Sequence, residues 1–310
     1  MGVCIGVDVA KAHLDWALGR NGKVERIANS PLGVRRLVKR LHQLEFDLVV
    51  LEATGQYERL LYEKLGEEGI PVVRLNPVRV RRFGQGMGVL AKNDVIDARM
   101  LALFGEKAEP PRRPQRTSRE RLLGDLAARR RQLIGIITAE KNRLEHASSC
   151  VSGDLRSLIR ILENRVEKLD QKIDGVISED EKQKGDFERL QTVPGVGPKI
   201  ARALLIDLPE LGTLDRRRIS SLVGLAPYAR DSGQRSGSRR IHGGRAAPRT
   251  ALYLAAMVGS RFNPELKEMY ERLRRNGKPP KLAFIALARK LLTILNAIVR
   301  DQSEWKTMTQ

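Results

Sequence analysis

Four acidic residues in three short segments are best suited to chemistry in this chain: Asp8, Glu52, Asp94 and Asp97. They lie in a protein with 57 Lys and Arg against 37 Asp and Glu, a formal net charge of +20. Hard divalent cations such as Mg²⁺ prefer oxygen ligands and bridge phosphate oxygens. Carboxylates that converge in a strongly cationic protein therefore predict a metal site for phosphodiester chemistry on nucleic acid.

Each acid alone also has a purely structural explanation. Asp94 could be a helix N-cap, Asp97 a first-turn acid and Asp8 a strand-end residue. All four together are harder to explain in this way, because neighbouring carboxylates repel each other unless a cation neutralises them. Asp94 and Asp97 are three residues apart, which places them on one face of a helix, and Lys92 just before them is a candidate phosphate contact.

The N-terminal pattern predicts the elements that position these acids. Three strands of an antiparallel meander come first, with a hairpin turn at Arg20-Asn21-Gly22, and helices and strands alternate after them. The expected elements are strands 3–9, 12–18 and 23–28, a helix from 31, a strand 48–52, a helix 57–66 and a strand 72–75. This is the order of an α/β RuvC-like (RNase H-like) domain, with Asp8 in the first strand and Glu52 at the carboxyl end of its neighbour.

A proline- and arginine-rich linker, residues 109–119, ends the first domain, which is expected over residues 1–108. Residues 109–184 carry two apolar stripes at helical spacing, interrupted at residues 148–153. They predict either a helical hairpin or an intermolecular coiled coil, and thus an α-helical coiled-coil connector where protomers meet in a homodimer or homotetramer. Arg129, Arg130 and Arg131 on the first helix predict a nucleic-acid track.

The remaining residues, 185–310, predict a mostly α-helical C-terminal domain. The run Val193-Pro194-Gly195-Val196-Gly197 leads into a helix and resembles a helix-hairpin-helix element. Glycines there would let backbone N–H groups approach a phosphate, so Gly195, Gly197 and Lys199 are candidate nucleic-acid contacts. Tight turns of this composition also occur for structural reasons alone.

A segment rich in serine, glycine and arginine between helices is either a flexible linker or a phosphate-handling loop. Ser232, beside Gly233, is the favoured nucleophile, and Ser236 and Ser238 are its rivals. Arginines could stabilise the negative charge of a phosphoryl transition state there, and a helix expected over 248–257 points its positive end at the loop. The six arginines are Arg230, Arg235, Arg239, Arg240, Arg245 and Arg249.

The composition argues against several other kinds of site and of protein. Cys4 and Cys150 form neither a disulfide framework nor a metal spacing, and the four histidines share no zinc spacing. No secretory leader and no stretch near the roughly 18 apolar residues of a membrane span is expected, so a cytoplasmic protein without a membrane partner is predicted. Aromatic residues make up 4%, which favours duplex contacts over base stacking. No Gly-Lys-Ser/Thr phosphate loop is present, so no nucleotide cofactor is expected.

With both groups of residues identified, the whole chain resembles the DEDD-type insertion-sequence transposases, which include the Piv-type DNA invertases and the bridge-RNA-guided recombinases. The resemblance runs from Gly6-Val7-Asp8-Val9-Ala10-Lys11 through Glu52-Ala53-Thr54-Gly55 and Asp94-Val95-Ile96-Asp97-Ala98 to Ser232-Gly233 and Gly243-Gly244-Arg245. It implies that Asp8, Glu52, Asp94 and Asp97 are metal ligands for Mg²⁺, with Mn²⁺ as the alternative ion. It also implies that Ser232 is the serine that joins covalently to DNA.

The resemblance further implies a DNA recombinase that acts on double-stranded target and donor DNA. A structured noncoding guide RNA would pair with both DNAs, and dimers or tetramers would complete the acidic site of one protomer with the serine of another. The expected location is the cytoplasm of a bacterial or archaeal cell, at the nucleoid. Two alternatives stay open: a RuvC-like junction-resolving nuclease without a covalent intermediate, and a non-enzymatic nucleic-acid-binding scaffold.

Overall fold

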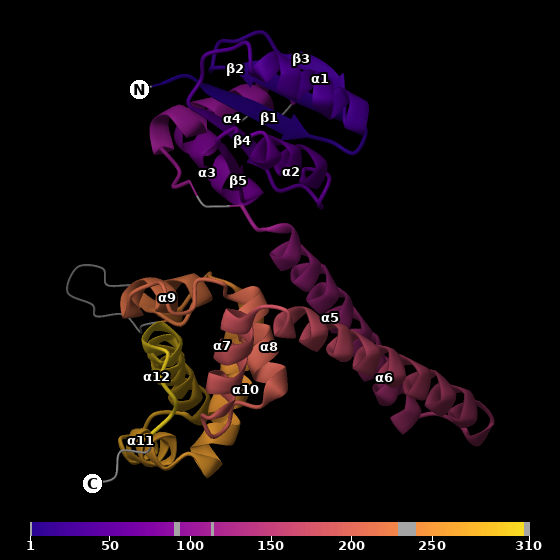
Figure 1. Ribbon diagram of the computed structural model, residues 1–310, viewed down its shortest axis with the longest axis vertical. Coiled ribbons are helices and arrows are strands. Elements are labelled where there is room, and N and C mark those ends of the chain that lie inside the picture. Colours follow the sequence, from indigo (N-terminus) through magenta and orange to yellow (C-terminus); the bar gives the residue numbers. More distant parts are fainter. Residues whose placement is uncertain (1, 90–93, 113–114, 229–239, 307–310) are drawn as a thin grey trace. The chain divides into compact units, whose positions relative to one another are not determined.

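A computed structural model describes residues 2–89, 94–112, 115–228 and 240–306 of the chain (Figure 1). The chain forms two compact units, Met1–Gln115 and Arg116–Gln310. The predicted subdivision of the second part at residues 184 and 185 stays a prediction.

The first unit is built on a five-stranded mixed sheet with strand order β3-β2-β1-β4-β5. β1 and β2, and β2 and β3, pair antiparallel, whereas β1 and β4, and β4 and β5, pair parallel. The expected antiparallel meander and the alternation of helices and strands after it are confirmed. The strands are β1 (Cys4–Val9), β2 (His13–Leu18), β3 (Glu25–Ala28), β4 (Leu48–Glu52) and β5 (Val72–Leu75).

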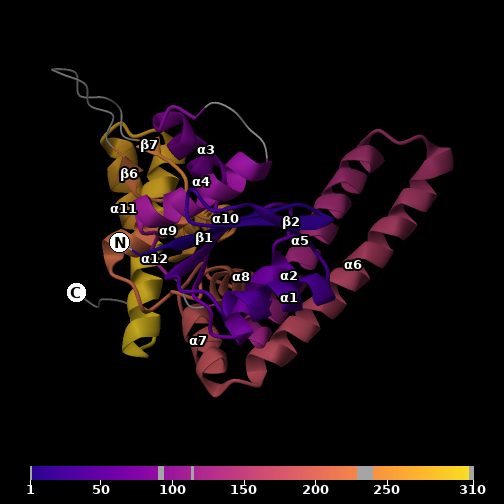
Figure 2. The same ribbon diagram turned by 90° about the horizontal axis from the view of Figure 1, so that it is seen from above.

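Helices cover both faces of this sheet (Figures 1 and 2). Alternating side chains divide β1 between two cores: Ile5 and Val7 pack with the first helix pair, whereas Cys4 packs with the second. Burial raises the pKa of the Cys4 thiol to about 11, so this free cysteine stays protonated in the core. The first pair is α1 (Pro31–Leu41) and α2 (Arg59–Glu67), and the second is α3 (Pro77–Gly86) and α4 (Asp94–Ala108).

Two glycines let α4 lie directly on the sheet. A Cβ atom on Gly6 would come within 2.0 Å of the Ala98 carbonyl oxygen and 2.5 Å of the Ala102 nitrogen. A Cβ atom on Gly105 would lie 2.9 Å from the Cys4 sulfur. Since such contacts are far below van der Waals distance, only glycine permits this helix-on-strand approach.

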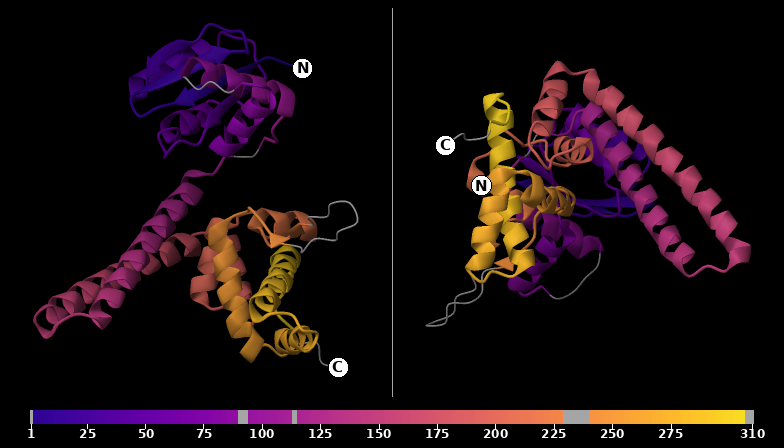
Figure 3. Two further views of the ribbon diagram at one scale, coloured as in Figure 1. Left: turned by 180° about the vertical axis from the view of Figure 1, so that it is seen from behind. Right: turned by 90° about the horizontal axis from the view of Figure 1, so that it is seen from below.

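In the second unit α5 (Ser118–Glu145) and α6 (Ser149–Ser178) form a long helical hairpin (Figure 3). The predicted apolar stripes meet in its seam, where Leu133 and Ile137 pack with Ile159 and Leu162. The helices pair within one chain, and the intermolecular coiled coil stays a prediction. The interruption expected at 148–153 is wrong in extent. α5 ends at Glu145 and α6 begins at Ser149, so residues 149–153 are helical.

Shorter helices complete the second unit around one apolar core. Leu190, Leu204, Ile219, Leu252 and Leu291 are fully buried in this cluster. The elements are α7 (Glu181–Gln191), α8 (Pro198–Asp207), α9 (Arg216–Val223), β6 (Pro227–Tyr228), β7 (Arg240–Ile241), α10 (Ala246–Phe262), α11 (Pro264–Arg275) and α12 (Pro280–Asp301).

One expectation from hydropathy needs correction. Within the described residues, α12 is long and apolar enough to cross a membrane, with a mean hydropathy of 1.9 in its best window. Its apolar side chains are used otherwise, because Leu287, Leu291 and Leu295 are fully buried in the core of the second unit. Asn296 on the same helix is buried too, donating to the Leu214 carbonyl and accepting from the Gly212 N–H. We interpret α12 as a core helix.

Candidate active site

A row of charged residues crosses four strands of the sheet. Arg26 on β3 pairs in register with Asp15 on β2, and Asp15 pairs with Asp8 on β1. The parallel register of β1 and β4 runs from Cys4 opposite Leu48 to Val7 opposite Leu51, so its next step places Asp8 beside Glu52. Adjacent strands lie about 4.8 Å apart, so the first two predicted acids are immediate neighbours.

The same row faces α4. Side chains alternate along a strand, and Gly6 and Val50 both contact the α4 side of the sheet. Asp8 and Glu52 follow these residues by two positions and therefore point to that side. Gly105 lies over Cys4 while Ala98 lies over Gly6, so α4 runs antiparallel to β1. Its first turn, which begins at Asp94 and contains Asp97, is thereby directed toward the Asp8 end of the strand.

The donor chemistry of these residues fits a hard divalent ion. Asp8, Glu52 and Asp97 are each half-buried and supply carboxylate oxygens. In the part of the chain whose side chains are described, which excludes the Asp94 side chain, no three acidic, histidine or cysteine side chains are close enough to hold a metal ion. The backbone thus brings the acid-bearing positions together, and the role of all four acids as ligands stays a prediction.

Hydrogen bonds fix the two loops that follow the acids. The Asn29 side-chain amide donates to the Ala10 carbonyl at 2.9 Å and to the Tyr57 carbonyl at 3.0 Å. It thereby joins the end of β1 to the turn that follows Glu52. In that turn Glu58, only 3% exposed, accepts from the Thr54 N–H at 3.2 Å and from the Arg74 guanidinium at 3.1 Å. The backbone that follows both acids is therefore held by side-chain hydrogen bonds.

We expect Asn29→Ala to lower the free energy of unfolding by about 2 kcal/mol, since two hydrogen bonds between loops are lost. Urea denaturation of the full chain measures this change. Asn21→Ala is the matched control, because Asn21 is exposed in the β2–β3 turn, and it should stay within about 0.5 kcal/mol of the parent protein. Equal effects of the two substitutions would contradict a clamping role for Asn29.

Asp15 was missed in the sequence, although it lies beside Asp8. It is 4% exposed, and Arg26 donates two hydrogen bonds of 2.8 Å to its two carboxylate oxygens. The His13 Nε2 atom lies 3.5 Å from the same carboxylate. A buried carboxylate needs such compensation, so the pair neutralises the third acid of the row. A sequence signal for this acid exists: in the predicted strand that contains His13-Leu14-Asp15-Trp16, Asp15 takes a position that faces the core.

Ser232 and its rivals Ser236 and Ser238 lie outside the described residues, as do Lys92, Arg230, Arg235 and Arg239. The three serines and Arg230, Arg235 and Arg239 belong to residues 229–239, which follow β6 and precede β7 in the chain; Tyr228 pairs with Arg240 across these two strands. Two glycines allow the backbone segments that flank this strand pair to approach closely: a Cβ on Gly244 would lie 2.2 Å from the Gly224 nitrogen, and both residues have positive φ. No larger residue fits where these two backbones cross.

Two of the three described arginines near β6 and β7 form hydrogen bonds within the protein. Arg245 donates to both carboxylate oxygens of Glu210 at 2.6 Å and to the Asp207 carbonyl at 3.0 Å. Arg249 donates to the Gly243 carbonyl, and Arg240 on β7 is exposed. The helix expected to start at 248 starts at Ala246 instead, because a proline in the first turn sacrifices no intrahelical hydrogen bond.

The helix-hairpin-helix-like element is formed by α7 and α8. Gly195 has a structural reason for being glycine: its φ is +100°, and a Cβ would lie 2.8 Å from Gly259 on α10. Gly197 caps α8 with open space around it, and Lys199 is exposed in the first turn. An N-terminus of this kind suits a phosphate, so Gly197 and Lys199 keep the phosphate interpretation, which stays untested.

Two residues of the predicted arginine track have internal partners. Arg130 donates to both oxygens of Asp170, at 2.6 and 3.1 Å, and Arg131 donates to Asp207 at 2.8 Å. With Lys199 and Arg202 they line a hollow of about 420 Å³ among α5, α6, α8 and α10. Arg129 is exposed on another side of α5. Binding of nucleic acid by all three arginines stays a prediction.

Comparison with known protein families agrees with this arrangement. Residues 5–147 match a family model of DEDD transposases of the IS110 type, described as "Transposase". Residues 187–271 match a second, described as "Transposase IS116/IS110/IS902 family". The chain belongs to the IS110/IS116 family of insertion-sequence transposases. As a transposase of this family, it is an enzyme of DNA strand cleavage and transfer.

Individual relatives of the transposase support the same assignment. It is 27% identical to the pilin gene-inverting proteins of Moraxella bovis and of Moraxella lacunata, over 96% of its own length and 95% of each relative. It is also 32% identical to the insertion element IS900 uncharacterized 42 kDa protein of Mycobacterium paratuberculosis, over 44% of its own length and 35% of that protein. The similarity to the gene-inverting proteins thus spans both units.

Proposed function

We propose that the chain is a DNA recombinase that cleaves and rejoins double-stranded DNA through a phosphoserine intermediate. The observation that carries this proposal is the shared face of Asp8, Glu52 and the first turn of α4. That arrangement brings acidic positions from three elements to one end of β1. A divalent ion bound by Asp8, Glu52, Asp94 and Asp97 would supply Lewis-acid activation of the scissile phosphate.

The chain's own residues would perform the covalent step. The Ser232 hydroxyl oxygen forms a bond to phosphorus while the bond from phosphorus to one strand oxygen breaks, and the serine proton ends on that oxygen. Arginines of the serine segment, Arg240 among them, would hold the negative charge of the transition state. Because one phosphoester replaces another, rejoining needs no nucleotide cofactor.

The proposal includes two kinds of partner, further copies of the chain and a noncoding RNA. The exposed apolar residues Ile134, Leu158 and Ile161 on the α5–α6 hairpin supply a surface through which protomers could associate. A structured noncoding RNA would select target and donor DNA by base pairing, which suits a protein with few aromatic residues. Such a complex would act on cytoplasmic DNA at the nucleoid.

Ser232→Ala tests the mechanism. The wild-type protein, incubated with Mg²⁺, the element's DNA ends and RNA copurified from cells, should yield a protein–DNA adduct that survives denaturing electrophoresis. We expect Ser232→Ala to lose both the adduct and strand cleavage, because no other group replaces the attacking oxygen.

Ser236→Ala and Ser238→Ala are the matched controls and should retain the adduct. If Ser232→Ala still cleaves and the wild type forms no adduct, the chain is instead a junction-resolving nuclease that uses water. If Asp8→Ala leaves cleavage under Mg²⁺ unchanged, cleavage does not depend on the acidic site and the proposed metal role of Asp8 is wrong.

A further inference from the structure

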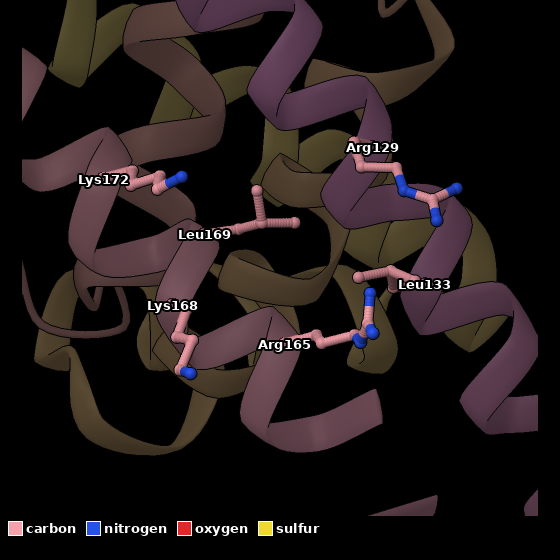
Figure 4. Close-up of a pocket in the computed structure, with 6 residues that line it drawn as sticks. All are labelled: Arg129, Leu133, Arg165, Lys168, Leu169 and Lys172. Carbon is pink, nitrogen blue, oxygen red and sulfur yellow. The ribbon is translucent and has the colours of Figure 1, made fainter. Parts of the chain in front are cut away.

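The α5–α6 hairpin has two sides of opposite electrostatic character. On the side that packs against α8, arginines and aspartates are paired: Arg130 with Asp170 and Arg202 with Asp174. On another side, a shallow hollow of about 180 Å³ is lined by Arg129, Arg165, Lys168 and Lys172 around Leu133 and Leu169, without an acidic residue (Figure 4). The first side is internally neutralised, and the second presents four cations.

Helical spacing produces this segregation. At about 100° per residue, Arg165, Lys168 and Lys172 fall within one narrow sector of α6. The acids of the same stretch, Glu163, Glu167, Asp170 and Asp174, fall in the opposite sector. Asp170 and Asp174 bind arginines, and Glu163 pairs with Lys141. The cationic sector of α6 is therefore not offset by acids of its own helix.

The cations of the hollow are available to a ligand. All four residues are exposed, and Arg165, Lys168 and Lys172 have no ion pair or hydrogen bond among the described residues. Arg129 donates only to Gln132 on its own helix, at 3.1 Å. In Figure 4 Arg129 comes from α5 while the other three come from α6, so cationic side chains of two helices line the hollow.

We infer that this cluster, formed by Arg129, Arg165, Lys168 and Lys172, binds the phosphodiester backbone of double-stranded DNA. The stretch from Arg165 to Lys172 spans about 10 Å of helix, over which a B-form duplex carries about six phosphate charges. Neither α5 nor α6 contains an aromatic residue, so stacking of unpaired bases is not available here. The inference rests on the proposed function in that DNA is the substrate, and it adds a contact surface on two helices, α5 and α6, that carry neither the four acids nor the serine.

The test is the salt dependence of DNA binding by the full-length protein, measured by fluorescence anisotropy on a duplex without divalent metal. Each phosphate contact contributes about −0.9 to the slope of log K against log salt. Arg165→Gln with Lys168→Gln should therefore reduce the magnitude of the slope by about 2, independently of DNA sequence. Because cleavage is absent from this assay, its outcome is separate from that of the Ser232→Ala experiment.

Two controls make the result specific. Lys182→Gln with Lys184→Gln removes the same charge from exposed positions of α7 and should leave the slope nearly unchanged. Arg165→Lys with Lys168→Arg conserves charge and should retain the wild-type slope. An unchanged slope in the first pair, or an equal change in the α7 pair, would overturn the inference. So would a loss confined to an A-form RNA duplex, which would assign the cluster to RNA.

Discussion

Replacing Asp8 by asparagine should reduce Mg²⁺-dependent DNA cleavage by roughly 10³-fold, equivalent to about 4 kcal/mol of transition-state stabilisation. Asp8 is the acid that adjoins both Asp15 and Glu52 in the row across the sheet. Its amide would keep the size of the side chain but remove the negative charge that a divalent ion requires. Single-turnover cleavage of a labelled DNA end measures the loss.

The same substitution should have the opposite effect on stability. Without metal, the carboxylates of Asp8 and Glu52 repel each other, so Asp8→Asn should raise the melting temperature. Divalent ions should stabilise the wild type and have little effect on the variant, because ligand binding stabilises only a fold that binds the ligand. Glu45→Gln, at an exposed acid of the same unit, is the control and should change neither property. A variant that cleaves normally would refute the metal-site proposal.

Gly6→Ala should have the largest effect on the fold of the first unit. The new methyl group would collide with the backbone of α4, which cannot rotate away as a side chain could. We expect a loss of about 3 kcal/mol in the free energy of unfolding and a drop of roughly 10 °C in melting temperature. Displacing α4 would also move Asp97 away from Asp8, so metal-dependent cleavage should be lost at temperatures where the fold survives.

Gly86→Ala is the matched control for this substitution. Gly86 lies near the end of α3, with open space where its Cβ would be. Alanine there should be neutral or slightly stabilising, since it favours helix. Calorimetry and circular dichroism of both variants make the comparison. If Gly6→Ala melts like Gly86→Ala, the close contact between β1 and α4 is incorrect.

The architecture of the first unit could be predicted because its signals are local. The apolar run ending at Glu52, the turn after β2 and the amphipathic pattern after Pro31 each determine one element. The apolar seam between α5 and α6 could be predicted for the same reason, since each helix carries its own apolar stripe. The predicted start of α10 is two residues late because proline favours the first position of a helix, whereas Pro248 is the third residue of α10.

The contacts that position the site could not be predicted, since they depend on residues far apart in the sequence. No local sequence pattern shows that the close approach of the Ala98 carbonyl requires glycine at position 6. Nor does one show that Asn29 donates to the carbonyls of Ala10 and Tyr57. The burial of Asp15 likewise depends on the register that brings Arg26 beside it. Sequence identified the acids, and only the fold revealed their neighbours.

The paired strands β6 and β7 also have a consequence for how such enzymes diversify. Tyr228 and Arg240 are paired across β6 and β7, so the eleven residues between them start and end at adjacent positions of one strand pair. Lengthening a loop with fixed ends costs little, because closure entropy grows only with the logarithm of length. We therefore expect the number of residues between Tyr228 and Arg240 to vary among relatives more readily than the paired strands that fix the two ends of this segment.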